Sequence, residues 1–296
     1  MSRLVFVGSV NADTIAVVPH LPAPDERFLA RAVVHAGGGN SATAAVAAAR
    51  LGGDVAFIGP VADDETGERI RADLTREGVD LSGVVPVPAG SGGASVVLVD
   101  QSTGTRAICT RPIPAFDLPV GRARELIAGA AWVHADHIGW PLVHALVAAH
   151  RGPQLSVDAG NPIDGFTPAG VDLYGPTIPS LRRAYGELPA PDLLARALAD
   201  GARRVVATDG PDGAFVAEHA GTHVRVPAFT VDVVSTLGAG DVFHGALVLA
   251  VDRGLGLPDA ARYANAAAAL SCRAIDGRSG IPTDDEVRAL LESPLP

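Results

Sequence analysis

The fold class that the sequence predicts is α/β: a doubly wound, mostly parallel sheet with a small inserted β lid. Short apolar runs of strand length alternate with alanine-rich or amphipathic stretches of helical length along most of the chain. Such alternation is typical of a parallel sheet that helices cover on both faces. Two further segments carry strand-like runs with no helix between them, and these segments predict the lid.

The individual elements follow from local composition. Residues 4–7 are apolar and end at Gly8, which indicates a buried strand of a parallel sheet. Residues 41–51 are rich in alanine and are followed by Gly52 and Gly53, which indicates a helix with a glycine stop. The other expected elements are strands at 55–58, near 132–133, at 155–157 and at 205–207, and helices at 65–77, 141–150 and 192–200.

The two lid segments are residues 12–36 and 94–111, and each has the pattern of a strand pair. No internal repeat, linker or break in composition divides the chain. We therefore expect residues 1–296 to form a single domain, with the lid as an insertion. A hydrophobic content of 48% is enough to build a full core for a domain of this size.

Composition excludes several classes of function. The net charge of −10 argues against broad binding to nucleic acid or anionic membrane, because both require a basic face. All 23 basic residues are arginines. A chain without lysine has no P-loop lysine, no protein-kinase strand lysine and no pyridoxal Schiff base. Any phosphate chemistry must therefore depend on backbone amides, arginine or a metal ion.

The sequence also gives expectations about location and cysteine chemistry. It contains no run of about 18 uncharged apolar residues, and residues 1–13 lack the pattern of a signal peptide. We therefore expect a soluble, cytoplasmic protein. Cys109 and Cys272 are the only cysteines and lie outside any CxxC spacing, so neither a disulfide framework nor a cysteine-based zinc site is expected.

Residues 233–247 carry the strongest functional signal. Gly238, Ala239 and Gly240 form a glycine-rich turn that enters an apolar helix. The backbone amides of such a turn converge on an anion and the helix dipole adds partial positive charge, so the turn predicts a phosphate cradle without lysine. Asp241 follows in the first helical turn. This carboxylate either complements the helix dipole or acts as a general base toward a hydroxyl group.

Four stretches in chain order resemble the signatures of the ribokinase-like (PfkB) carbohydrate kinases. They are residues 8–13 (GSVNAD), 37–52 (GGGNSATAAVAAARLG), 227–247 around the Gly-Ala-Gly-Asp turn, and 277–282 (GRSGIP). The resemblance covers almost the whole chain. It implies the fold described above and an enzyme that transfers a phosphoryl group from ATP to a hydroxyl of a small sugar substrate.

The resemblance also implies roles for individual residues. Asp241 matches the catalytic base, which takes the proton of the attacking hydroxyl. Gly238, Ala239 and Gly240 match the anion hole, and Asp13 matches a carboxylate that holds sugar hydroxyls. The other matched positions are Asn11, Gly38, Gly39, Asn40 and Thr43 on the substrate side and Thr208, Gly210, Gly213, Thr236, Asn265 and Gly280 on the nucleotide side.

Two departures from the family pattern concern ions. Ser235 stands where most members carry an aspartate that helps to bind a monovalent cation, so potassium activation does not carry over. Residues 176–180, Pro-Thr-Ile-Pro-Ser, stand where members carry Asn-x-x-Glu, which organises Mg²⁺ through water. Mg²⁺ is still expected to accompany ATP, held largely by the nucleotide and by water. The residues that would form a metal site are therefore not defined by the sequence.

A third departure concerns the substrate. Thr43 stands where most members place a sugar-binding asparagine, and with residues 241–246 and 277–282 it is similar to the sulfofructose kinase branch. That branch phosphorylates the 1-hydroxyl of a ketose that carries a 6-sulfonate. An arginine that the branch carries near the present Ile138 and Gly139 is missing, so sulfonate specificity does not follow.

An anionic ketose is nevertheless the predicted substrate. Arg27, Arg106 and Arg111 lie in the lid segments, where we expect them in strands. The planar guanidinium donates paired hydrogen bonds to phosphate, sulfonate or carboxylate oxygens. The alternative is that these arginines only protect exposed strand edges.

Two other functions fit the same residues. One is a nucleoside kinase, because the family also phosphorylates ribosyl 5′-hydroxyls. The other is a catalytically impaired sugar-binding protein, which Ser235 and the missing Asn-x-x-Glu favour. The resemblance further implies a homodimer, because lids of this type often pair with a second copy. His244, one turn after Asp241, faces either the active site or the helix surface, and the sequence does not decide between them.

Overall fold

The computed structural model describes residues 2–103, 105–118, 121–150, 152–219 and 221–293, and a central sheet organises them. Across this sheet, the eight strands found in the described residues are β14 (Val224–Val226), β13 (Ala214–Ala217), β12 (Val205–Thr208), β11 (Leu173–Pro176), β10 (Gln154–Ala159), β9 (Trp132–Ala135), β1 (Arg3–Val7) and β4 (Asp54–Ile58). All pairs from β4 to β12 are parallel, whereas β13 pairs antiparallel with both β12 and β14.

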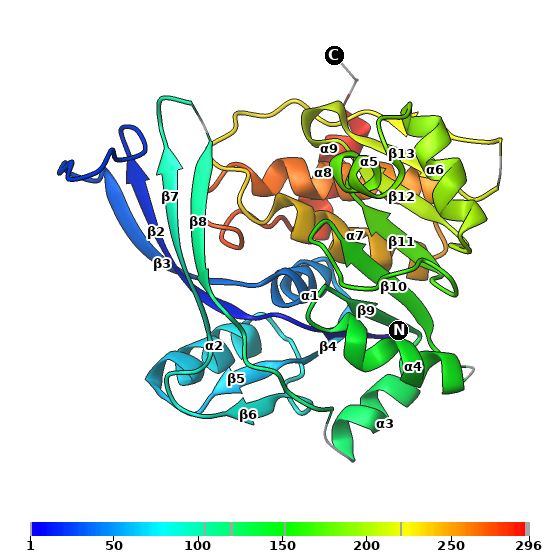
Figure 1. The fold of residues 1–296 in the computed structure, drawn as a ribbon, viewed down its shortest axis with the longest axis horizontal. Helices are drawn as coiled ribbons and strands as arrows, with labels where there is room; N and C mark the ends of the chain where they lie inside the picture. Colours follow the sequence, from blue (N-terminus) through cyan, green and yellow to red (C-terminus); the bar gives the residue numbers. More distant parts are fainter. Residues whose placement is uncertain (1, 104, 119–120, 151, 220, 294–296) are drawn as a thin grey trace.

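Helices cover both faces of the sheet, as predicted (Figure 1). Side chains of β1 alternate between the two faces: Leu4 and Phe6 enter one hydrophobic core, and Val5 and Val7 enter the other. Helices on the Leu4 side are α1 (Asn40–Arg50), α2 (Glu65–Arg76), α7 (Ala239–Asp252), α8 (Leu257–Ser271) and α9 (Asp284–Glu292), and those on the Val5 side are α3 (Arg122–Ala128), α4 (Trp140–His150), α5 (Ile178–Tyr185) and α6 (Ala190–Ala199). The doubly wound α/β prediction is confirmed.

A second sheet forms the β lid. Its strands are, in order, β3 (Ala32–Gly38), β2 (Asn11–Val18), β7 (Gly93–Asp100) and β8 (Arg106–Arg111). Both predicted lid segments contribute a hairpin, and the two hairpins join through the parallel pair β2 and β7. Residue 104 of the second segment lies outside the described residues. A short parallel pair, β5 (Pro60–Ala62) and β6 (Val85–Val87), adjoins α2.

One face of the lid is apolar and packs on the body of the protein. Ile15 and Val17 of β2 and Val97 and Val99 of β7 form a buried cluster with Leu237, just before the glycine-rich turn. This contact holds the lid over that turn, because removing these side chains from water is favourable in proportion to the apolar area buried.

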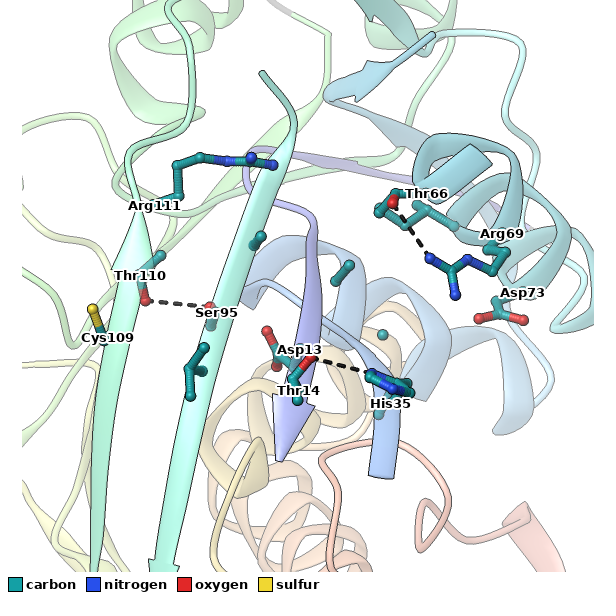
Figure 2. Close-up of a pocket in the computed structure, with 16 residues that line it drawn as sticks. Asp13, Thr14, His35, Thr66, Arg69, Asp73, Ser95, Cys109, Thr110 and Arg111 are labelled. Atoms are coloured by element: carbon teal, nitrogen blue, oxygen red, sulfur yellow. Dashed lines mark hydrogen bonds between the residues drawn. The ribbon is translucent and has the colours of Figure 1, made fainter. Parts of the chain in front are cut away.

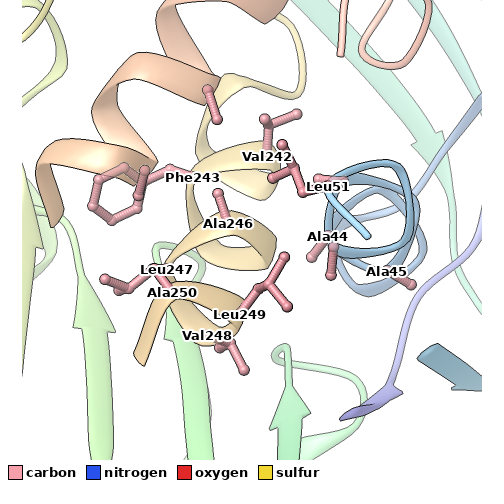
Figure 3. Close-up of a cluster of buried hydrophobic side chains, with 14 of the residues drawn as sticks. Ala44, Ala45, Leu51, Val242, Phe243, Ala246, Leu247, Val248, Leu249 and Ala250 are labelled. Carbon is pink, nitrogen blue, oxygen red and sulfur yellow. The ribbon is translucent and has the colours of Figure 1, made fainter. Parts of the chain in front are cut away.

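Helix α7 carries Asp241 and packs tightly on α1 (Figure 3). Alanine and glycine at the contact let the two backbones approach: a Cβ added at Gly245 would lie 2.1 Å from the carbonyl oxygen of Ala44. The first turns of the two helices consequently meet, and the Asn40 side-chain amide donates to Asp241 Oδ1 at 2.8 Å. Among the described helices, none combines the length and apolar character needed to cross a membrane.

Candidate active site

A cleft of about 500 Å³ lies between the lid and the carboxyl ends of β10, β11 and β12. Asp158, Thr177 and Thr208 line it from these strand ends, and Asp13 and Ser95 line it from the lid. Helix α7 begins at its edge. Open α/β sheets bind ligands in the crevice outside the carboxyl ends of their strands, so the position of this cleft is that of a binding site.

In the glycine-rich turn at this cleft, the Leu237 and Ala239 amides are engaged within the turn, whereas no side chain covers the backbone at Gly240. Gly238 caps α7 in the left-handed conformation, with a φ of 74°. The Ser235 Oγ accepts a hydrogen bond from the Leu237 amide at 3.2 Å, and the Ala239 amide donates to the Thr236 carbonyl at 3.3 Å. A Cβ added at Gly240 would meet no atom within 4 Å. The first amides of an α-helix have no carbonyl partner within the helix, so this end of α7 suits an anion.

Asp241 has the environment of a general base. Part of its side chain is open to the cleft, but protein surrounds the carboxylate, and the resulting loss of hydration raises its pKa to about 7. The neighbouring charge of Asp158 acts in the same direction, whereas His244 and the Asn40 hydrogen bond act against it. A base titrating near neutral pH combines an available ionised form with a strong affinity for a proton.

The lid side of the cleft offers acceptors that lack donors. Asn11 Oδ1 and Asp13 Oδ1 are buried and have no hydrogen-bond partner among the described residues. Burial raises the pKa of Asp13, while the positive charge of Arg278 lowers it. A buried acceptor without a donor costs about 1–3 kcal/mol, which a bound hydroxyl group would offset.

A buried arginine stands behind this acceptor pair. Arg278 is 8% exposed, and it donates from Nε to Thr43 Oγ1 at 3.2 Å and from Nη2 to the Gly38 carbonyl at 2.7 Å. Gly37 and Gly38 form a wall of bare backbone between Arg278 and Asp13. A Cβ at Gly37 would lie 2.2 Å from Arg278 Nη1, and one at Gly38 would lie 2.1 Å from Asp13 Oδ2. Because Arg278 only donates, Thr43 accepts from it and keeps its own hydroxyl proton for the cleft.

A second arginine links the lid to the glycine-rich turn. Arg106 of β8 lines the cleft and donates from Nη1 to Thr236 Oγ1 at 2.7 Å. Its guanidinium therefore lies beside the anion-binding end of α7. This geometry brings the Asp241 carboxylate, the amides at the start of α7 and the Arg106 guanidinium to the same cleft.

The sequence matches the pfkB family of carbohydrate kinases over residues 1–120 and 166–284. The chain belongs to this family. A ribose-1-phosphate kinase from Halopiger xanaduensis, described as ATP-dependent, is 32% identical over 98% of both chains. Ribokinase from Bacillus subtilis is 30% identical over 98% of this chain and 100% of its own. The structure of Arabidopsis thaliana ribokinase complexed with ribose and ATP superposes with a TM-score of 0.84 at 25% identity, covering 99% of each chain.

Most residues that the sequence singled out in this carbohydrate kinase meet at the cleft. Those that line it are Asn11, Asp13, Gly38, Gly39, Asn40, Thr43, Arg106, Thr208, Thr236, Gly238, Gly240 and Asp241. Ala239 lies within the same turn without lining the cleft. Segments far apart in the chain thus converge where the two sheets and α7 adjoin.

Four nucleotide-side residues are not among those lining the cleft. Gly210 begins a 3₁₀ turn, and Gly213 ends it against the Val226 carbonyl. Asn265 of α8 is 7% exposed and donates to the carbonyls of Val226 and Pro227, each at 3.0 Å. Gly280 packs against the Ser271 carbonyl. In this conformation their contacts hold loops in place.

Two of the predicted lid arginines lie elsewhere. Arg27 was expected in a strand but lies in the exposed loop between β2 and β3. Pro22 and Pro24 in this loop lack the amide donors that a strand would need. Arg111 lies in β8, but its side chain donates to the Gly92 carbonyl and lines a different groove (Figure 2). Among the three arginines, Arg106 alone lines the cleft.

This second groove, of about 670 Å³, is larger than the cleft but lacks its chemistry. It lies between the outer face of the lid and α2, where Arg69 and Asp73 face the lid strands (Figure 2). It contains neither Asp241 nor the glycine-rich turn. The residues that the sequence predicts to be catalytic therefore lie at the smaller cleft.

Sequence reasoning missed two residues of the site and left a third undecided. Asp158 follows the apolar run of β10, and its place at the carboxyl end of a parallel strand was a usable signal. Arg278 lies inside a motif that was noticed, but no local pattern indicates that its side chain turns inward. His244 faces the cleft and is 5% exposed, so it is not a helix-surface residue.

The described residues offer no metal centre of their own. No group of three or more His, Cys, Asp or Glu side chains in the described part of the chain could hold a metal ion. Where the family carries Asn-x-x-Glu, Thr177 and Ser180 instead form a capping box at the start of α5.

Proposed function

We propose that this kinase transfers the γ-phosphoryl group of ATP to a hydroxyl group of a sugar, with Asp241 as the general base. The observation that carries the proposal is the placement of a carboxylate with a pKa of about 7 beside the open amides of α7, in a cleft that also holds unpartnered acceptors. The pfkB family membership supports the same reaction.

The residues supply the parts that phosphoryl transfer requires. Asp241 accepts the proton of the attacking hydroxyl, and a positioned base of this kind contributes about 10²–10⁴-fold. The amides at the start of α7 then face the charge on the transferring group, and they are already oriented before it arrives. Positioning and charge stabilisation provide most of the catalysis in this class of reaction.

The substrate side suits a polyhydroxyl compound. Asn11 Oδ1 and Asp13 Oδ1 would accept from two hydroxyl groups, and Thr43 would donate to an oxygen of the sugar. A sugar carries both hydroxyl donors and oxygen acceptors, so it could form hydrogen bonds with all three of these side chains. This complementarity favours the enzyme over an impaired binding protein, because Asp241 and the glycine-rich turn are also intact.

We propose that the sugar substrate carries an anionic group and that Arg106 binds this group. Arg106 is the arginine that reaches the cleft from the lid, and its guanidinium suits phosphate, sulfonate or carboxylate. The relative that is 32% identical acts, by its name, on ribose 1-phosphate, which is an anionic sugar. A sulfofructose substrate stays a prediction from the resemblance.

ATP fits the open end of α7, and Mg²⁺ would enter bound to its phosphates. Ser235 has no carboxylate, and its hydroxyl accepts a hydrogen bond from the Leu237 amide. The proposal therefore includes no dedicated monovalent-cation site. When bound, Mg²⁺ would neutralise phosphate charge, while the residues named above orient the reactants.

Asp241→Asn tests the role of the base. The substitution keeps the shape of the side chain, so nucleotide binding and thermal stability should change little, while kcat falls by about 10²-fold or more. The matched control is Asp252→Asn, the same change at the far end of α7. Turnover like that of the wild type in Asp241→Asn would contradict the assignment.

A substrate panel tests the acceptor. It would compare ribose, fructose, ribose 1-phosphate, fructose 6-phosphate, fructose 6-sulfonate and adenosine by kcat/KM, in the wild type and in Arg106→Ala. We expect an anionic sugar to be preferred and to lose most in Arg106→Ala. Preference for adenosine would instead indicate a nucleoside kinase, and an equal loss for every substrate would give Arg106 a structural role.

We also propose that two copies pair through the outer face of the lid. This face exposes Val33 and Val96, which are 59% and 52% exposed, and Val96 also lines the larger groove. Large exposed apolar side chains grouped on a sheet often mark an interface. Light scattering of the purified protein should give a dimer, and Val96→Asp should convert it to a monomer.

A further inference from the structure

A buried ion pair lies next to Asp241. His244 Nε2 lies 3.4 Å from Asp158 Oδ1, and the two side chains are only 6% and 7% exposed. Both residues line the cleft, and His244 follows Asp241 by one turn of α7. The proposed reaction assigns no role to either of them.

The surrounding structure makes room for this pair. A Cβ added at Gly175 of β11 would lie 2.4 Å from His244 Cε1, so a larger residue there would displace the imidazole. The ring of His134 lies 5.6 Å from that of His244, centroid to centroid. The Gly160 amide donates to Asp158 Oδ1 at 2.9 Å and fixes the carboxylate. The pair is therefore held from several elements.

Asn40 connects the pair to the base. Its side-chain amide donates to Asp241 Oδ1 at 2.8 Å and lies 3.4 Å from Asp158 Oδ2. Two carboxylates thus meet at one amide group in a largely dry site. Like charges at such proximity strongly disfavour each other, and one of them normally keeps a proton unless a positive charge intervenes.

His244 supplies that positive charge. Burial would lower the pKa of His244, but the carboxylate of Asp158 raises it above its usual value. Burial would likewise raise the pKa of Asp158, but the charge and hydrogen bond of His244 hold it below its usual range. Each member of the pair therefore stabilises the charged form of the other.

The other titratable or charged groups around Asp241 are fixed by different partners. Asp136, after β9, accepts hydrogen bonds from the amides of Ser9 and Ser41, and burial keeps His134 neutral with a pKa of about 3. Arg278, beyond the Gly37–Gly38 wall, stays charged because its pKa falls only to about 10. Near neutral pH, His134 therefore stays neutral and Arg278 stays charged.

We propose that Asp158 and His244 are positioning residues that control when Asp241 is ionised. The imidazolium neutralises Asp158, so that Asp241 does not have to share a proton with a second bare carboxylate. Asp158 in turn holds the imidazolium beside itself, away from a direct pairing with Asp241 that would weaken the base. The inference rests on the proposed role of Asp241, but its first test does not require turnover.

The test is the titration of Asp241 by carbon-13 NMR of aspartate-labelled full-length protein, with the signal assigned through Asp241→Asn. His244→Gln keeps a donor near Asp158 but removes the charge, and it should raise the Asp241 midpoint by about one pH unit or more. Asp158→Asn removes the negative charge and frees the imidazolium to pair with Asp241 directly, so it should lower the midpoint. Opposite directions are the signature, because general damage to the fold would not separate the two variants by sign.

The matched control is Asp172→Asn. Asp172 is also a buried carboxylate, but it pairs with Arg203 and accepts from the Leu155 amide at the opposite end of β10. It should leave the Asp241 midpoint unchanged. The acidic limb of kcat/KM against pH, measured with the substrate panel above, should shift with the NMR midpoint in each variant.

Several results would overturn the proposal. Midpoints that move in the same direction in both variants, or that stay within about 0.3 pH unit of the wild type in folded protein, would do so. If either variant fails to fold, nitrogen-15 NMR of wild-type His244 decides, and a neutral imidazole at pH 7 overturns the ion pair. Opposite shifts together with full activity of Asp241→Asn would instead leave the pair intact and refute the proposed base.

Discussion

Gly238→Ala separates the backbone requirement of the glycine-rich turn from ordinary packing. Gly238 has a φ of 74°, and a Cβ at this position would lie 2.8 Å from the Gly277 Cα and 3.0 Å from its carbonyl oxygen. The left-handed conformation costs a non-glycine residue about 1–2 kcal/mol. The close contact is with backbone, which cannot rotate away, and overpacking of this kind adds about 1–3 kcal/mol.

Two other glycines provide controls. Gly254 has a φ of 85° and an added Cβ would meet nothing within 4 Å, so Gly254→Ala measures the conformational cost alone. Gly240 has neither a positive φ nor a neighbour within 4 Å, so Gly240→Ala should be neutral or slightly stabilising. The expected order of stability is therefore Gly240→Ala, then Gly254→Ala, then Gly238→Ala.

The assays are thermal unfolding and initial rates. For a large domain, about 1 kcal/mol corresponds to about 2–4 °C in Tm, so the combined cost of about 2–5 kcal/mol should lower the Tm of Gly238→Ala by about 4–20 °C. A displacement of the turn by about 1 Å should also reduce kcat by about 10²-fold, because the amides would no longer meet the transferring group. If Gly238→Ala matches Gly254→Ala in Tm and keeps wild-type activity, the close contact with Gly277 does not shape the turn.

Two further predictions concern the walls of the cleft. Because Ser235 supplies no carboxylate, potassium should activate the enzyme only weakly. Replacing a bulky organic cation by potassium should change kcat/KM by less than about tenfold, which is equivalent to about 1.4 kcal/mol. A larger activation would show that backbone carbonyls alone form a cation site. Arg278→Met should raise KM for the sugar by about tenfold without changing KM for ATP, and Thr43→Val should do the same, because the arginine acts by orienting the threonine hydroxyl. Additive effects in the double variant would mean that the two residues act independently.

The sequence alone determined the fold class and located the glycine-rich turn. Hydrophobic periodicity is a local property, so the strands at 4–7 and 55–58 and the helix at 41–51 were predicted within about two residues of β1, β4 and α1. The Gly-Ala-Gly-Asp turn was equally readable, because its glycines and its carboxylate lie next to each other in the chain. The antiparallel strands β13 and β14 were not predicted, since they lie outside the alternation of strand and helix that indicated the parallel strands.

Tertiary structure decided which side chains share the cleft. Arg27 and Arg106 were both expected in lid strands, but Arg27 lies in a loop and Arg106 contacts Thr236. Strand pairing fixes which face each residue of β8 presents. Arg278 reaches Thr43 and His244 reaches Asp158 across contacts between segments far apart in sequence. Such contacts, and the pKa values that depend on them, arise from packing and burial, which no single segment of the chain encodes.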